Sequence, residues 1–128
     1  MKRLLYVRLV LRALFELCRY DVLRGLFGVK NVERQLCKPV SLPVPDRLLE
    51  TSICDAMVLA TCLYWKPVLC LQRSICTVRL LRRRRLQARL VIGYRSAPFL
   101  SHAWVEVGDR VVNDSPAYRD RLRVLYTA

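Results

Sequence analysis

The sequence is poor in acidic residues and in histidine, and it contains no long apolar run. It has 10 Asp and Glu against 23 Lys and Arg, which gives a formal net charge of +13, and it has 1 His. The longest uncharged apolar run, 56–65, is half of the roughly 20 residues that a transmembrane helix needs. No transmembrane helix is therefore predicted, and the excess of positive charge indicates an acidic partner.

Zinc-type and targeting patterns are also lacking. The 6 cysteines include no C-x-x-C pair, so we predict no metal site and no cofactor. The basic start resembles a signal peptide, but Arg8 and Arg12 interrupt the apolar segment that such a peptide requires. We therefore expect a cytoplasmic protein whose cysteines are free thiols.

The length and composition fit one folded domain, 1–128. With 54% hydrophobic residues the chain has enough material for a core. We expect 1–47 to hold an N-terminal helix and a proline-containing connector, and 48–128 to form the core that carries the chemistry. The connector is placed at 38–46, where prolines favour extended backbone.

Three helices are predicted in the first two thirds of the chain. The first runs from Lys2 to about Phe27, and we expect it to be mostly buried over the core rather than to lie on a membrane. Its charges form one stripe, which consists of Arg8, Arg12, Glu16 and Arg19. The second helix is expected from near Thr51 to Tyr64, and the third from just after Pro67 into the arginines at 82–85.

The later part of the chain is rich in β-branched residues. Strands are predicted at 88–94, 100–107 and 110–113, with a turn at Gly108-Asp109 between the last two. Helices followed by consecutive short strands are typical of an α+β domain, in which N-terminal helices pack on a small antiparallel sheet.

Nucleophilic catalysis would have to use the lone histidine, His102, because serine and cysteine nucleophiles commonly need an imidazole base. A reactive thiol is favoured at a helix N-terminus, where unpaired N–H groups stabilise a thiolate. That criterion selects Cys54 and Cys70 over Cys62 and Cys76, which lie within helices, and it leaves both candidates open.

Several motifs occur in a characteristic order between residues 65 and 116. They are Cys70-Leu71-Gln72-Arg73-Ser74, Ala88-Arg89-Leu90-Val91-Ile92-Gly93, Pro98-Phe99, His102-Ala103-Trp104-Val105-Glu106 and Val111-Val112-Asn113-Asp114-Ser115-Pro116. Together they resemble the lasso peptide biosynthesis B proteins, in their transglutaminase-like cysteine protease part. One departure is Arg85, near which the family commonly has glycine.

The resemblance implies a papain-like fold and a catalytic triad. Cys70 would be the nucleophile, His102 the base and Asp114 the residue that orients the imidazole. The implied activity removes the leader from a ribosomally made precursor peptide, which exposes the core amine for macrolactam formation. The implied partners are the precursor's leader, a separate leader-recognition protein and an ATP-dependent, asparagine synthetase-like lasso cyclase.

The spacing of His102 and Asp114 can be tested against hairpin geometry. A two-residue Gly108-Asp109 loop would place the two side chains on opposite faces of the sheet. A three-residue loop, 107–109, would pair Glu106 with Arg110 and His102 with Asp114. The sequence analysis therefore predicts the three-residue loop, and a turn-forming role remains the alternative for Asp114.

Two other functions compete with leader cleavage. The same three residues would serve an acyltransferase of the transglutaminase or acetyltransferase type if an amine replaced water. Arg79 and the arginines at 82–85 would suit a nucleic-acid-binding module. The signature motifs of common nucleic-acid folds are absent, so we expect no nucleic-acid partner.

Overall fold

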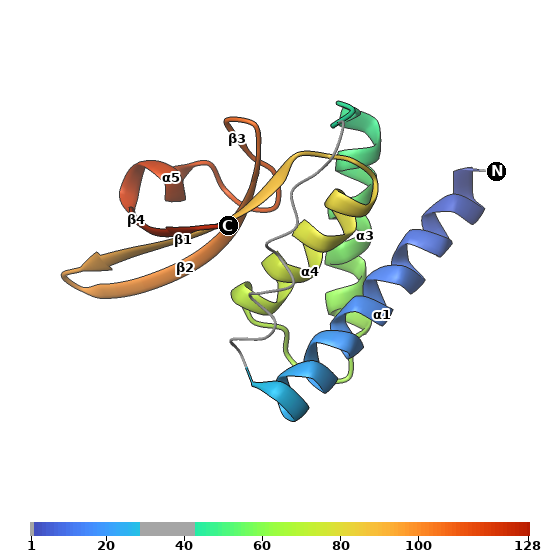
Figure 1. Cartoon of the computed structure of the whole chain (residues 1–128), viewed down its shortest axis with the longest axis horizontal. Helices are drawn as coiled ribbons and strands as arrows, with labels where there is room; N and C mark the ends of the chain where they lie inside the picture. Colours follow the sequence, from blue (N-terminus) through green and yellow to red (C-terminus); the bar gives the residue numbers. More distant parts are fainter. Residues whose placement is uncertain (1, 29–42) are drawn as a thin grey trace.

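The computed structural model describes residues 2–28 and 43–128 and confirms the predicted α+β class (Figure 1). Three longer helices come first, and a four-stranded antiparallel sheet follows. The elements are α1 (Lys2–Phe27), α3 (Arg47–Leu63), α4 (Cys70–Arg83), β1 (Ala88–Ser96), β2 (Phe99–Val107), β3 (Arg110–Val111), α5 (Ala117–Arg121) and β4 (Arg123–Thr127).

The sheet has the strand order β3-β2-β1-β4 and two different faces. Alternation along β2 puts Ala103 and Val105 in the core shared with the helices, and puts Trp104 in a smaller cluster on the other face. α4 packs against β1 and β2, while α1 packs against α3 and α4. α1 therefore lies farthest from the sheet, and α5 lies beside the sheet on the side away from α1 (Figure 1).

Gly93 on β1 pairs with His102 on β2, and its lack of a side chain is required there. A Cβ at this position would lie 2.6 Å from Trp104 and 2.9 Å from Leu122. Glycine therefore lets the Trp104 ring of β2 lie across β1 on the outer face of the sheet, opposite His102 in the strand pairing.

α1 has the predicted bounds, but the prediction that it is mostly buried is wrong. Its buried residues form one stripe facing α3 and α4, and many large apolar residues on the opposite side are exposed. The predicted charge stripe is also not uniform, because Glu16 is buried whereas Arg8 and Arg12 are exposed. A helix that is apolar on two sides gave no clear sequence signal for which side would be covered.

α3 starts earlier than expected. It begins at Arg47, because the Asp46 side chain accepts a hydrogen bond from the Leu49 N–H at 3.0 Å and caps the helix. The predicted start near Thr51 therefore came one turn late. The connector prediction falls partly at 38–42, outside the described residues, and the described part, 43–46, has no regular secondary structure.

α4 ends at Arg83, two residues before Arg85, near which the resemblance leads us to expect glycine. Arg85 has a φ of 62°, in the left-handed region that glycine adopts without steric cost. The Leu86 N–H donates to the Leu81 carbonyl and closes the helix end. The departure at Arg85 thus leaves the helix exit intact, although a non-glycine residue occupies a strained position.

The C-terminal elements α5 and β4 were not predicted. α5 is only five residues long, and β4 is exposed along its length, so neither gives a strong periodic pattern. Within the described residues, no helix combines the length and apolarity needed to cross a membrane. The division of the domain at residue 47 stays a prediction.

Candidate active site

The cysteines occupy very different environments. Cys70 is the first residue of α4 and is half-buried. Cys54 lies two turns inside α3, because that helix begins at Arg47, and burial followed by the nearby acids Glu50 and Asp55 raises its pKa to about 12. The two candidates that the sequence left equal are thus distinguished, since only Cys70 lies at a helix N-terminus.

The other thiols do not share this position. Burial raises the pKa of Cys76, which lies within α4, and Cys18 and Cys62 are exposed within α1 and α3. The described cysteines form no disulfide. Cys37 lies outside the described residues.

His102 and Asp114 are in direct contact, although not by the predicted route. His102 Nε2 lies 2.7 Å from Asp114 Oδ2. The predicted three-residue loop is wrong, because Val107 pairs with Arg110 around a two-residue turn, and Gly108 in that turn has a φ of 60°. The expectation that such a turn would separate His102 from Asp114 is wrong as well.

His102 and Asp114 still meet because the pairing between β2 and β3 ends before it reaches Asp114. β3 ends at Val111, and after the Val112 N–H bonds the Val105 carbonyl the chain stops following a regular ladder. The Asn113 side chain, rather than its backbone, then accepts from the Val105 N–H at 2.7 Å. Asp114 is therefore released from strand alternation and turns over the edge of β2 toward His102.

Arg73 connects α4 to this pair. Its Nη2 lies 3.0 Å from Asp114 Oδ2, the same oxygen that contacts His102, while Asp114 Oδ1 accepts the Ser115 N–H at 2.8 Å. Asp114 thus accepts from two donors, contacts the imidazole as well, and is only partly exposed. Because the contact with Asp114 uses Nε2, Nδ1 is the imidazole nitrogen left to face a nucleophile.

A second set of hydrogen bonds fixes α4 against β2. Ser74 Oγ donates to the Ala103 carbonyl at 3.1 Å and accepts from Asn113 Nδ2 at 3.2 Å. Cys70 lies one turn before Arg73 and Ser74 on the same side of α4. These bonds anchor the first turns of α4 against β2 and against the Asn113 side chain. In the described part of the chain Cys70 and His102 are not hydrogen-bonded to each other.

The His102 ring is also held by an aromatic contact that the sequence analysis missed. Its centroid lies 4.1 Å from that of Tyr118 in a stacked arrangement with 30° between the planes. Tyr118 belongs to α5, so the missed helix positions the imidazole. A proline directly before the first helical residue, here Pro116 before Ala117, is the signal that could have indicated this helix.

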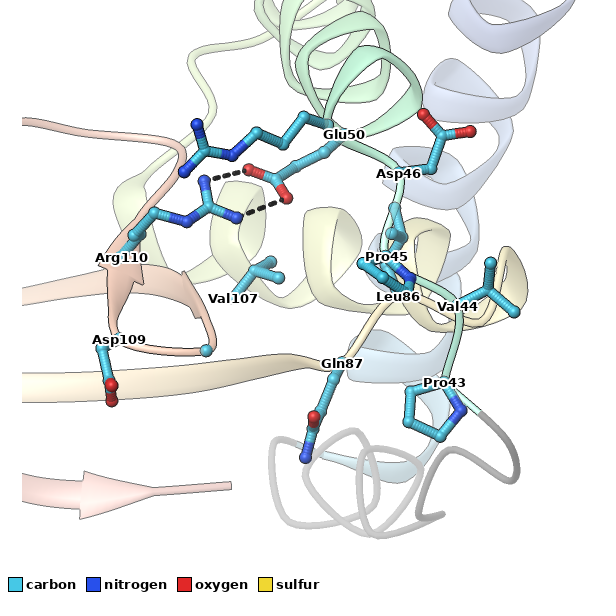
Figure 2. A pocket seen from close by; sticks show the side chains of 12 residues that line it. Pro43, Val44, Pro45, Asp46, Glu50, Leu86, Gln87, Val107, Asp109 and Arg110 are labelled. Atoms are coloured by element: carbon cyan, nitrogen blue, oxygen red, sulfur yellow. Dashed lines mark hydrogen bonds and ion pairs between the residues drawn. The ribbon is translucent and has the colours of Figure 1, made fainter.

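A separate pocket of about 350 Å³ lies near the C-terminal end of β2 (Figure 2). It is lined by residues 43–47, by the link between α4 and β1, and by the β2–β3 turn. Glu50 of α3 accepts two hydrogen bonds from Arg110 in its wall, at 3.0 and 3.2 Å. This ion pair ties the hairpin to the helices and shares no residue with the His102–Asp114 contact.

Among residues 2–28 and 43–128, no group of three or more His, Cys, Asp or Glu side chains could hold a metal ion.

A comparison with known families identifies the class of this fold and site. The model of the transglutaminase-like superfamily matches residues 16–127, and the chain belongs to that superfamily. The microcin J25-processing protein McjB of Escherichia coli is 52% identical to the chain over 56 residues. That match covers 44% of this chain and 27% of McjB. No solved structure matches the chain.

These matches confirm the resemblance that the ordered motifs indicated. The superfamily match begins within α1 and ends within β4, so it includes elements that the sequence motifs did not cover. The transglutaminase-like core is therefore established for most of the chain.

Proposed function

We propose that the chain is a cysteine peptidase of lasso-peptide maturation, in which Cys70, His102 and Asp114 form the catalytic triad. The observation that carries the proposal is the 2.7 Å contact between His102 and Asp114 beside a helix that begins with a cysteine. The name of McjB, a processing protein, supports a precursor peptide as the substrate.

The reaction follows from the chemistry of the three groups. His102 Nδ1 takes the proton of the Cys70 thiol, and the sulfur attacks the carbonyl carbon at the leader–core junction. The protonated imidazole then donates its proton to the leaving amine, so the core departs with a free N-terminal amine. The leader remains as a thioester on Cys70, which water hydrolyses to a carboxylate. Asp114 holds the imidazole in the required tautomer and stabilises its charged form.

The start of α4 also suits the oxyanion that forms during attack. The N-cap residue, Leu69, offers no side-chain acceptor to the first N–H groups of the helix. Such unpaired N–H groups and the positive end of the helix dipole favour a negative oxygen. Backbone donors next to Cys70 therefore supply transition-state stabilisation without another catalytic side chain.

The test is cleavage of a synthetic precursor peptide, followed by mass spectrometry. Cys70→Ala should abolish cleavage, whereas Cys54→Ala and the exposed-thiol control Cys62→Ala should retain it. A leader product with a free carboxylate supports the peptidase. An amide-linked leader adduct would instead identify an acyltransferase, and retained cleavage by folded Cys70→Ala would refute the assignment of the nucleophile.

The proposed partners lead to a second expectation, which concerns the rate of cleavage. A separate leader-recognition protein would raise the effective concentration of the leader at the peptidase, and the freed amine would be the substrate of an ATP-dependent cyclase. Purified chain alone should therefore cleave more slowly than chain mixed with the recognition protein. Equal rates would contradict a role for that partner.

A further inference from the structure

The outer side of α1 is an apolar stripe on a helix that already buries its other side. Six large apolar residues on it are between 51% and 70% exposed: Leu4, Val7, Leu11, Phe15, Val22 and Leu26. Their separations of three, four and seven residues place them along one line of an α-helix. With a rise of 1.5 Å per residue, the stripe is about 33 Å long.

Basic side chains border this stripe. Arg8 and Arg12 are exposed on the edge nearest α4, and Arg83 of α4 reaches the same edge through its ion pair with Glu16. The acid is buried and has three arginines around it, so this edge remains positive overall. An apolar line with a positive border suits an anionic, partly apolar surface.

The corner next to the end of α1 continues the apolar surface. Tyr64 and Lys66 both hydrogen-bond to Asp21 of α1, so the intervening Trp65 is held beside the last turns of that helix. Trp65 is 78% exposed, and Leu63 before it is exposed as well. Exposed tryptophan near apolar and basic residues is characteristic of the membrane–water interface.

From these observations we propose that the outer side of α1 binds to the surface of a membrane containing anionic lipids. The helix would lie parallel to the surface, with its apolar stripe in the acyl boundary and its arginines among the headgroups. A second copy of the chain suits this surface less well, because each copy carries a net charge of +13.

The experiment is cosedimentation of the full chain with vesicles of phosphatidylglycerol and phosphatidylcholine, and with vesicles of phosphatidylcholine alone. The chain should bind the anionic vesicles more strongly, and added salt should weaken that binding. Phe15→Gln should reduce the affinity about tenfold, because the aromatic ring no longer enters the bilayer. Leu125→Gln, a similarly exposed apolar position on β4, should bind like wild type.

The arginine border is tested separately. Arg8→Gln with Arg12→Gln should lower the affinity for anionic vesicles about fivefold per arginine and leave binding to neutral vesicles unchanged. Circular dichroism checks that each variant is folded, and all of them should cleave a soluble precursor at the wild-type rate.

Two results would overturn the proposal. The first is no vesicle binding by wild type at low salt, and the second is equal binding by wild type and folded Phe15→Gln. If the first result is accompanied by a loss of self-association or of partner-protein binding in Phe15→Gln, the stripe is a protein interface.

Discussion

Glu16 and Asp114 are two carboxylates held by arginines of α4, on opposite sides of that helix. Glu16 is 1% exposed, and its Oε2 accepts from Arg79 at 2.9 Å, while Arg83 lies 3.2 Å from Oε1 without hydrogen-bond alignment. Asp114 is 20% exposed and divides one oxygen between Arg73 and an imidazole. The first carboxylate is surrounded by fixed charge in the interior, whereas the second contacts a group that can gain and lose a proton.

This difference separates a structural role from a chemical one. Burial and then the charge of Arg79 lower the pKa of Arg19, while the charge of Glu16 acts in the opposite direction. The carboxylate therefore offsets part of the repulsion among the arginines around it. At Asp114 the arginine comes from the same helix as Cys70, so the contact connects the helix of the proposed nucleophile to the residue that holds the proposed base. α4 therefore uses one side to attach to α1 and the other to assemble the site.

The largest expected effect is at the chemical carboxylate. Asp114→Asn keeps the shape but removes the charge that stabilises the imidazolium, and comparable triads lose about 10⁴-fold in turnover. Precursor cleavage, followed by mass spectrometry, should show this loss while the circular dichroism spectrum is unchanged. The exposed control Asp120→Asn should retain activity, and wild-type activity in Asp114→Asn would mean that Asp114 is only a turn residue.

The matched change at the structural carboxylate should act on stability. Glu16→Gln removes the charge of a buried carboxylate and weakens its ion pairs with three partly exposed arginines, so the free energy of unfolding should fall by about 1.5–3 kcal/mol. Urea denaturation measures this, and Asp55→Asn, an exposed acid on α3, should change stability by less than about 0.5 kcal/mol. If Glu16→Gln lowers the free energy of unfolding no more than Asp55→Asn does, Glu16 has no structural role that distinguishes it from Asp114.

A third carboxylate, Glu106, gives a smaller and pH-dependent effect. Burial would raise its pKa, but hydrogen bonds from Arg89 and Trp104 outweigh burial and lower the pKa below 4.5. A lowered folded-state pKa contributes stability above the ordinary pKa, and that contribution is lost as pH falls through the folded-state value. Glu106→Gln should therefore destabilise by about 1–3 kcal/mol at pH 7. The difference from wild type should shrink below about pH 4.5, and a difference independent of pH would contradict this role for Glu106.

The smallest effect is expected at the end of α4. Arg85→Gly relieves the left-handed backbone and should stabilise the fold by about 1 kcal/mol. Arg84 has a φ of −97°, so Arg84→Gly should destabilise instead. Thermal unfolding of the two variants compares neighbouring arginines directly, and equal shifts would show that the conformation of Arg85 is not strained.

Local patterns in the sequence predicted much of the fold and named the candidate site residues, whose catalytic roles stay a prediction. The apolar and β-branched patterns predicted three helices and three strands, and the ordered motifs selected Cys70, His102 and Asp114. The contact between His102 and Asp114 was predicted correctly, but from an incorrect strand register. The two residues meet because the Asn113 side chain takes over the hydrogen bond to Val105 and ends the regular pairing, and no local sequence pattern reveals that interaction.

The remaining errors also have physical causes. The start of α3 depends on one side-chain cap at Asp46, and its earlier start moved Cys54 away from a helix N-terminus. The exposure of the outer side of α1 depends on which of two apolar stripes packs against α3 and α4. The Tyr118 contact comes from a helix of five residues, which is too short to give a periodic signal.

The central claim is that His102 activates Cys70, and the most direct measurement is the rate of thiol alkylation by iodoacetamide, followed at each cysteine by mass spectrometry. Cys18 and Cys62 are exposed and provide internal controls in the same molecule. At pH 7, Cys70 should react at least about tenfold faster than either control, and the advantage should disappear in His102→Gln. If Cys70 reacts no faster than Cys18 and Cys62, or equally fast with and without His102, the account of the site is wrong.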